Sequence, residues 1–213
     1  ELVGPAKISR LVRLAKAQPD TMAVIDNPRH ADQLSQAAAA AKVRLNLLID
    51  IDPGSRRTGV QAGAPAIELA QYATKLPNLN LRGIHSYSGA SAHVLGFEAR
   101  QAHSQKAMTP SIETYFQLKQ AGLPLEILSG GSTGTYNIDP GFKGMTELQV
   151  GSYVFMDVEY RNIGSQTGPV YGDFGASLMV IATVISRNER NRATVDAGFK
   201  AFATDRKFGP EVH

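Results

Sequence analysis

The chain of 213 residues contains no cysteine. This absence excludes a disulfide framework, a thiolate metal site and a cysteine nucleophile. No stretch reaches the ~18 consecutive apolar residues that a membrane-spanning helix requires. The polar first residues also lack the basic and then apolar plan of a signal peptide. We therefore expect a soluble, cytoplasmic protein that has no membrane partner.

The motifs of several common site types are missing as well. No Gly-Lys-Ser/Thr sequence occurs, which excludes a nucleotide P-loop, and the glycine spacing does not match a dinucleotide fingerprint. No Gly-x-Ser-x-Gly elbow supports a serine nucleophile. The spacings His-x-His and His-Glu-x-x-His do not occur either, so we assign no metal ligand to this chain.

The charge of the chain is small and spread out. Its net charge is +3 and its pI about 9.2, but the lysines and arginines are scattered and form no basic stripe. A nucleic-acid partner is therefore not expected. With 43% hydrophobic and 19% charged residues, the chain is too apolar for disorder and can form a large core. Its length allows one large domain or two small ones.

Short apolar runs alternate with helical segments along most of the chain. Strands are expected at 21–26, 45–52, 81–87, 125–129 and 147–155, and helices at 2–17, 30–42, 65–76 and 97–121. Pro110 should break or kink the last helix. This alternation is typical of βαβ units around a parallel sheet. We expect an α/β fold, a (β/α)8 TIM barrel whose N-terminal part is missing because both ends look cut. The alternative is an open doubly wound sheet.

The pattern changes after Asp157. Residues 177–186 and 193–196 are β-rich, and the charged segment 187–192 reads as a hairpin connection between them. Because no helix separates these strands, they should be antiparallel. We therefore expect a barrel over residues 1–157 and the start of a β-rich C-terminal domain over residues 158–213.

A glycine- and hydroxyl-rich segment, residues 129–135, directly follows the fourth strand. Backbone N–H groups and hydroxyls in such a segment can bind a phosphate, although a flexible surface loop is the alternative. Gly151, Ser152 and Tyr153, on the fifth strand, offer further donors. Parallel barrels commonly build a phosphate site after their last strands. The two segments together therefore favour a phosphate site.

Other candidate residues follow the second and third strands. Arg57 could fix an anionic oxygen of a ligand or lie in a solvent-facing loop. Tyr87 could stack on a planar ring or belong to the core. Asp50 and Asp52 share one face of a strand, and we expect one of them to hold Arg57 or to cap a loop. His85 lies within a strand and receives no role.

Seven segments resemble, in order and spacing, the D-threonine aldolase and D-serine dehydratase group of the alanine racemase-like, fold type III pyridoxal-phosphate enzymes. These segments are Val3–Lys7, Ile25–Asn27, Ile49–Val60, Gly83–Tyr87, Ser129–Thr135, Glu147–Asp157 and Asp196–Lys200. The resemblance covers essentially the whole chain. It implies pyridoxal 5'-phosphate as the cofactor and a barrel followed by a β-domain, usually in a homodimer.

The resemblance also implies roles for individual residues. The cofactor phosphate would be held by Gly130, Gly131, Ser132, Thr133, Gly151, Ser152 and Tyr153. Tyr87 would lie beside the pyridine ring and Arg57 near the phenolic oxygen, and these two are the candidate catalytic residues. Gln149 would face the pyridine nitrogen, where a neutral amide implies a weaker electron sink than an aspartate.

The implied activity is that of a lyase for D-3-hydroxy amino acids, assisted by a divalent metal such as Mn, that releases glycine and an aldehyde. The alternatives are D-serine dehydration, amino-acid racemisation and a non-catalytic pyridoxal-phosphate protein. A sugar-phosphate-binding barrel enzyme is a further alternative outside the resemblance.

Two parts of the family pattern have no match in the chain. The family's Schiff-base lysine would lie upstream of Glu1, and Lys200 matches a different motif. The family's metal ligands, a His and an Asp, would lie beyond His213. We therefore interpret the chain as a fragment, which should be inactive by itself.

Overall fold

The computed structural model describes residues 2–202 and 209–211. The chain divides into two compact units, Glu1–Gly151 and Ser152–His213. No helix among the described residues is long and apolar enough to cross a membrane.

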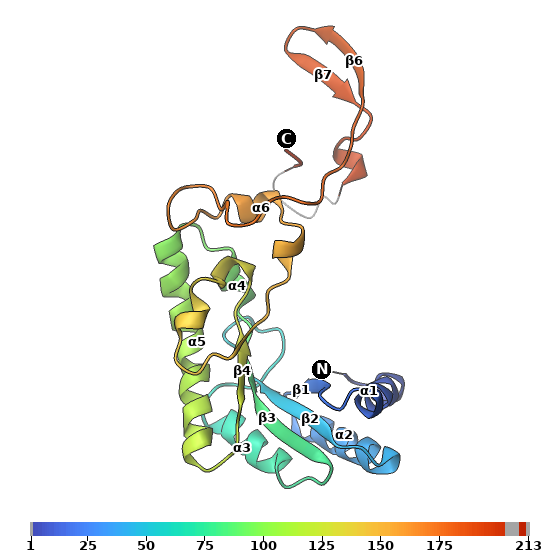
Figure 1. The fold of residues 1–213 in the computed structure, drawn as a ribbon, viewed down its shortest axis with the longest axis vertical. Helices are drawn as coiled ribbons and strands as arrows, with labels where there is room; N and C mark the ends of the chain where they lie inside the picture. The colour runs from blue at the N-terminus through green and yellow to red at the C-terminus, as the bar shows by residue number, and fades with distance from the viewer. Residues whose placement is uncertain (1, 203–208, 212–213) are drawn as a thin grey trace. The chain divides into compact units, whose positions relative to one another are not determined.

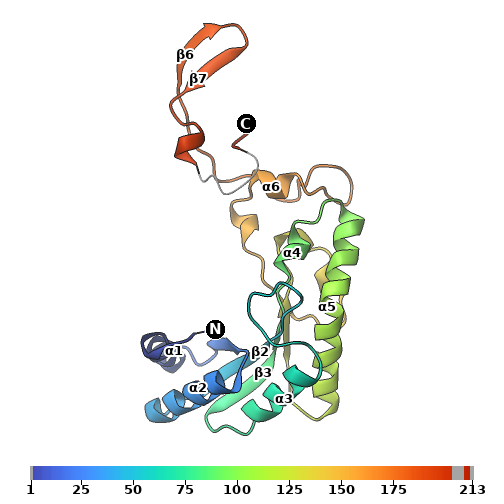
Figure 2. The ribbon, with the colours of Figure 1, turned by 180° about the vertical axis from the view of Figure 1, so that it is seen from behind.

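A parallel sheet forms the centre of the first unit (Figure 1). Its strands are β1 (Met22–Ile25), β2 (Leu45–Asp50), β3 (Leu79–His85), β4 (Ile127–Gly130) and β5 (Glu147–Leu148). Its helices are α1 (Pro5–Ala17), α2 (Pro28–Ala41), α3 (Ala64–Ala73), α4 (Gly89–Ala92) and α5 (Phe97–Gln120). Figure 2 shows the same elements from behind.

The spatial order of the strands is their order in the sequence, β1-β2-β3-β4-β5, and each adjacent pair is parallel. A doubly wound sheet would instead reverse its order at a switch point. Repeated right-handed crossovers in one direction place the helices on one face, as in a barrel. The predicted barrel-type α/β fold is thus confirmed, and the open doubly wound alternative is wrong.

The two faces of the sheet have different chemistry. Leu45, Leu47 and Ile49 of β2 belong to the apolar core that also contains side chains of α1, α2 and α3. Side chains alternate along a strand, so Leu48 and Asp50 point to the opposite face. All six residues of β2 are buried, as is typical of strands covered on both sides.

A register shift separates two stretches of the β2–β3 pairing. Leu47 pairs with Leu81, but the next residue, Leu48, pairs with Gly83, so β3 contains one extra residue at this point. Leu81 and Ile84 consequently both face the helical core, although three positions separate them. A Cβ on Gly83 would lie 1.8 Å from the carbonyl oxygen of Ile127, so this position requires glycine.

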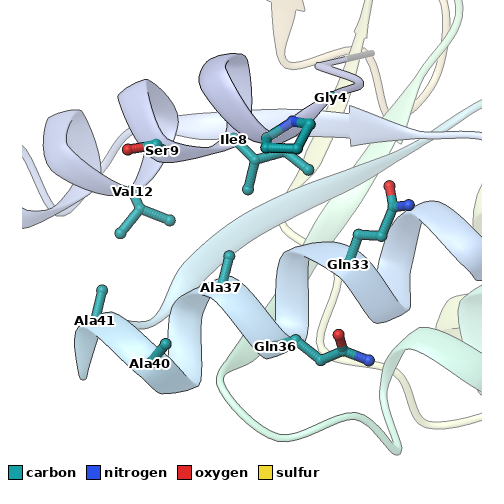
Figure 3. Close-up of a pocket in the computed structure, with 10 residues that line it drawn as sticks. Gly4, Ile8, Ser9, Val12, Gln33, Gln36, Ala37, Ala40 and Ala41 are labelled. Atoms are coloured by element: carbon teal, nitrogen blue, oxygen red, sulfur yellow. The ribbon is translucent and has the colours of Figure 1, made fainter.

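An open groove lies between α1 and α2 (Figure 3). Its volume is about 620 Å³, and Ile8, Val12, Ala37 and Ala41 contribute apolar side chains to it. None of its lining residues carries a charged or titratable side chain. The groove therefore offers surface for packing rather than groups for chemistry.

The predicted break at Pro110 does not occur, because α5 continues as one α-helix of 24 residues. Proline removes one helical N–H. Buried side chains on both sides, including Met108 and Leu118, hold the two halves in place. The hydroxyl of Thr114 also donates to the carbonyl oxygen of Pro110 at 2.7 Å.

The fifth strand is much shorter than the predicted range 147–155. Only Glu147–Leu148 forms β5, and Ser152–Val154 forms a 3-10 turn. The neighbouring strand β4 ends at Gly130, whose carbonyl accepts the Gln149 N–H at 2.8 Å. Beyond this point β4 offers no further partner for strand pairing.

The second unit contains a short helix, α6 (Val158–Arg161), and the antiparallel pair β6 (Val184–Glu189) and β7 (Arg192–Val195). The antiparallel pairing confirms the prediction, but two boundaries were wrong. Residues 177–183 form no strand, because the pairing with β7 begins at Val184. Residues 187–189 belong to β6 instead of the connection, which is a two-residue turn at 190–191.

Candidate active site

A cavity of about 350 Å³ lies over the inner face of the sheet, which is the face opposite the helical core. Its lining residues are Leu2, Met22, Ala23, Val24, Leu48, His85, Ser129, Glu147 and Gln149. His85, Ser129 and Gln149 lie at the carboxyl ends of β3, β4 and β5, and Glu147 is the first residue of the two-residue strand β5. Active sites of parallel barrels lie at this end of the strands.

A continuous chain of hydrogen bonds connects the ends of four strands. The carboxylate of Asp50 lies 2.5 Å from Nδ1 of His85, whose Nε2 lies 3.0 Å from Oε1 of Gln149. The Gln149 amide nitrogen donates to the Ser129 hydroxyl at 3.0 Å. Ser129 in turn donates to Glu147 at 2.8 Å. We call this set of five residues the polar chain.

The loop after β2 is held by both aspartates that the sequence placed on one face. Oδ1 of Asp52 accepts the backbone N–H groups of Gly54 and Arg56, at 2.9 and 3.0 Å. Asp52 therefore caps the loop, which is one of the two alternatives for this pair. Asp50 accepts the hydroxyl of Thr58 at 2.7 Å, which joins the loop to the polar chain.

Arg57 and Tyr87 come together although they follow different strands. The guanidinium carbon of Arg57 lies 5.4 Å from the centre of the Tyr87 ring, within the range of a cation–π contact. Arg57 is exposed and Tyr87 is half-buried. The pair therefore presents a positive charge and an aromatic ring side by side.

The glycine-rich segment turns sharply after β4. Gly131 has a positive φ of 71°, and a Cβ there would lie 2.7 Å from Cδ2 of Leu148. A Cβ on Gly130 would lie 2.6 Å from the carbonyl oxygen of Ser86. Both positions therefore require glycine because of contacts with the protein itself. Ser132 and Thr133, which follow, are buried.

A buried carboxylate supports this turn. Asp139 accepts hydrogen bonds from the hydroxyls of Ser104 and Thr135, both at 2.6 Å. The Thr135 oxygen accepts the backbone N–H of Ser132 at 3.0 Å. Burial raises the pKa of Asp139 above 3.8, and its two hydroxyl donors oppose the shift. Asp139 thus holds the turn through Thr135.

Arg100 fixes the turn from the side of α5. This arginine is completely buried, and its Nε donates to the carbonyl oxygen of Gly134 at 2.7 Å. A second donor of the same guanidinium reaches the carbonyl oxygen of Val94 at 3.0 Å. The backbone of the turn is therefore tied to the long helix.

The other predicted phosphate ligands are exposed. Gly151 is the last residue of the first unit, and a Cβ there would meet no atom within 4 Å. Ser152 and Tyr153 belong to the 3-10 turn η3 (Ser152–Val154) of the second unit. The ring of Tyr153 lies 5.6 Å from that of Phe174. All three have backbone or side-chain atoms open to solvent.

Sequence reasoning missed His85, Asp139 and Arg100. His85 occupies the end of a strand two residues before Tyr87, which was a usable signal. Asp139 begins an Asp-Pro-Gly turn soon after the glycine-rich segment. Nothing in the sequence distinguished Arg100 from the other arginines of an apparently solvated helix.

In the described parts of the chain, no group of three or more His, Asp or Glu side chains could hold a metal ion.

Residues 2–159 match the sequence family described as alanine racemase, N-terminal domain, and residues 177–213 match the family described as putative serine dehydratase domain. The chain is 36% identical over 207 residues to the 3-hydroxy-D-aspartate aldolase of Paracoccus denitrificans (strain Pd 1222), covering 96% of this chain and 54% of that protein. It is 35% identical over 210 residues to the D-threonine aldolase of an Arthrobacter species, covering 99% and 54%.

Among solved structures, the D-threonine aldolase from Filomicrobium marinum superposes with a TM-score of 0.85 at 32% identity. The match covers 96% of this chain and 54% of that one. The chain thus spans about half the length of the curated relatives it matches.

Proposed function

The chain belongs to the alanine racemase N-terminal domain family, and on this premise we propose that it is the cofactor-binding part of a pyridoxal-phosphate-dependent lyase for D-3-hydroxy amino acids. Its similarity to two aldolases of D-configured hydroxy amino acids supports the reaction class. The observation that carries the proposal is the polar chain at the carboxyl ends of β2 to β5, which the Thr58–Asp50 hydrogen bond joins to the loop that carries Arg57.

The chemistry of these groups fits the cofactor. Pyridoxal phosphate has a flat ring with an anionic phenolic oxygen, a ring nitrogen and a phosphate dianion. Tyr87 offers an aromatic face and Arg57 a cation in contact with it. Gln149 offers an amide in a cavity of about 350 Å³, a volume within the usual range of small-molecule pockets.

Each residue then has a definite task. Tyr87 covers one face of the ring and excludes water there. Arg57 neutralises the phenolic oxygen through a charge-assisted hydrogen bond. Gln149 provides a neutral hydrogen-bond partner for the ring nitrogen. When bound, the cofactor supplies an electron sink for the charge left at Cα as the Cα–Cβ bond breaks.

The phosphate is assigned to two segments. Gly130, Gly131, Ser132 and Thr133 follow β4 in the first unit, whereas the family resemblance alone assigns Gly151, Ser152 and Tyr153 to the phosphate. Asp139 and Arg100 support the proposal indirectly, because they hold the backbone of the first segment in one conformation. The Ser132 N–H already donates to Thr135, so this hydrogen bond orders the turn, and the remaining donors of the turn would bind the phosphate without a further cost for ordering them.

The remaining parts of the proposal come from the family resemblance. We propose a barrel over residues 1–157 followed by a β-domain, a homodimer, a cytoplasmic location and activation by a divalent metal such as Mn. The described residues contribute no cluster of metal ligands, so no step of the reaction is assigned to a metal here.

A dehydratase is the second candidate, because residues 177–213 match a putative serine dehydratase domain. With D-threonine, aldol cleavage releases acetaldehyde and glycine, whereas dehydration releases 2-oxobutanoate and ammonia. The two products therefore separate the candidates.

The experiment uses the intact protein with added pyridoxal phosphate and D-threonine, with L-threonine as the control substrate. We expect glycine and acetaldehyde from the D-enantiomer only. Formation of 2-oxobutanoate would favour the dehydratase. No cofactor absorption band and no product with either enantiomer would rule out the proposal.

A further inference from the structure

We propose that His85, held by Asp50, is a positioning residue that fixes the orientation of the Gln149 amide. This orientation decides whether Gln149 offers a hydrogen or an oxygen to a ligand in the cavity. The inference rests on the proposed function only where it names the ligand atom, the pyridine nitrogen of the cofactor. The positioning itself is a property of the polar chain.

The orientation can be worked out from Glu147, at the far end of the chain. A carboxylate only accepts hydrogen bonds, so the single hydroxyl hydrogen of Ser129 points to Glu147, 2.8 Å away. The Ser129 oxygen must then accept from Gln149, 3.0 Å away, and only the amide nitrogen can donate. Oε1 of Gln149 therefore faces His85.

The same reasoning continues through the imidazole. Because Oε1 of Gln149 only accepts, Nε2 of His85 carries a hydrogen across the 3.0 Å contact. On its other side, Nδ1 shares one hydrogen with the Asp50 carboxylate at 2.5 Å. The side chain of Asp50 is only 4% exposed, and Thr58 holds its second oxygen. The ring cannot rotate without breaking both contacts.

This arrangement determines what Gln149 can present to a ligand. Its oxygen is taken by the His85 hydrogen, and one amide hydrogen points to Ser129. The second amide hydrogen is left for the cavity. A donor of this kind pairs with an unprotonated pyridine nitrogen and disfavours the protonated one, because two N–H groups would then face each other. His85 thus keeps the ring nitrogen unprotonated through Gln149.

The test compares His85→Phe, which keeps a flat ring but has no donor, with His85→Gln, whose amide can still donate to Gln149. The matched control is His103→Phe. His103 is an exposed histidine of α5 that forms a hydrogen bond with Ser91 and is not part of the polar chain. Thermal unfolding of each variant shows whether it folds.

The first readout needs no cofactor. Nitrogen-15 NMR of histidine-labelled intact protein should show a hydrogen on Nε2 of His85. The side-chain amide hydrogens of Gln149 should exchange slowly in wild type, His85→Gln and His103→Phe, and rapidly in His85→Phe. An unprotonated Nε2, or equal exchange in wild type and His85→Phe, would overturn the positioning role even if the cofactor binds.

The second readout uses pyridoxal phosphate labelled with nitrogen-15 in the ring. We expect the shift of an unprotonated nitrogen in wild type and a change toward the protonated value in His85→Phe, with partial recovery in His85→Gln. Affinity for the cofactor should fall by less than about tenfold, because the phosphate turn is unchanged. A ring nitrogen that is protonated in wild type, or insensitive to His85→Phe, would overturn the assignment to the pyridine. If no variant binds the cofactor, the proposed function fails and the first readout alone decides the positioning role.

Discussion

The guanidinium carbon of Arg57 lies 5.4 Å from the centre of the Tyr87 ring, although these residues are thirty positions apart and follow different strands. The loop that carries Arg57 is fixed at its base by Asp52 and Asp50. The contact therefore combines an exposed side chain with a backbone that hydrogen bonds hold in place. Two residues chosen from the sequence for separate reasons thus form one surface.

The first prediction concerns this surface. Arg57→Ala in the intact protein should weaken pyridoxal phosphate binding by about tenfold, or about 1.4 kcal/mol, because the phenolic oxygen loses a charged donor. Arg56→Ala is the matched control, since the exposed neighbour contributes its backbone N–H, which the substitution keeps, to the Asp52 cap. Titration of each apo protein with the cofactor measures the difference. Equal affinities for the two variants would remove Arg57 from the site.

The second prediction concerns Gly131. A valine there meets Cδ2 of Leu148 at 2.7 Å and adopts an unfavourable φ of 71°. Gly131→Val should therefore displace the turn and lower the affinity for the cofactor by more than about tenfold. Gly141→Ala is the control, because a Cβ at this position meets no atom within 4 Å. If Gly131→Val binds the cofactor like wild type, the glycine-rich turn is not the phosphate site.

The third prediction follows from the raised pKa of Asp139. In the window between 3.8 and that raised pKa, the native carboxyl holds a proton that the unfolded chain has lost. Stability should therefore fall as the pH rises through this window, by at most about 1.4 kcal/mol per pH unit. Asp139→Asn should abolish this slope. Urea unfolding across the window measures it, with the fully exposed Asp20→Asn as the control; a slope unchanged in Asp139→Asn would contradict the assignment.

The fourth prediction concerns His30, which should make stability rise with pH, whereas Asp139 should make it fall. Burial lowers the pKa of His30 below 6.5, against a raising effect of the Leu2 carbonyl. As the pH falls through 6.5, the unfolded chain binds a proton that the native His30 does not. Stability should therefore fall with acidification in this range, again by at most about 1.4 kcal/mol per pH unit. His30→Gln should remove this dependence in urea unfolding, whereas His103→Gln, at an exposed position, should retain it.

The sequence was sufficient for the elements that local signals define. Periodicity and Pro or Gly boundaries predicted β1 to β4 and α2, α3 and α5 to within a few residues. Asn27 and Pro28 illustrate why, since the Asn27 side chain caps α2 by accepting the His30 N–H at 2.8 Å and proline occupies the first turn. Such signals act within a few residues of the boundary that they set.

The polar chain could not be predicted, because it depends on which residues face each other across strands. Regular alternation along β3 would place His85 on the same face as Leu79 and Leu81, toward the helical core. The contact between His85 and Asp50 exists only because of the register shift after Leu81. Likewise, Asp139 and Arg100 act on a turn that only the folded chain brings to them.

The register shift in β3 decides which side chains of this strand face the cavity and which face the helical core. If the same residues paired without the register shift, Asp50 would lie opposite Ile84, and the imidazole would point into the hydrocarbon core while isoleucine entered the cavity. Deletion of Arg82, the unpaired residue, would therefore keep Asp50 opposite His85, because Leu81 and Gly83 would then follow Leu47 and Leu48 one for one, whereas an insertion at this point would exchange the two faces downstream of it. The chemistry of this cavity depends on where β3 shifts its register against β2 as much as on the identity of its residues.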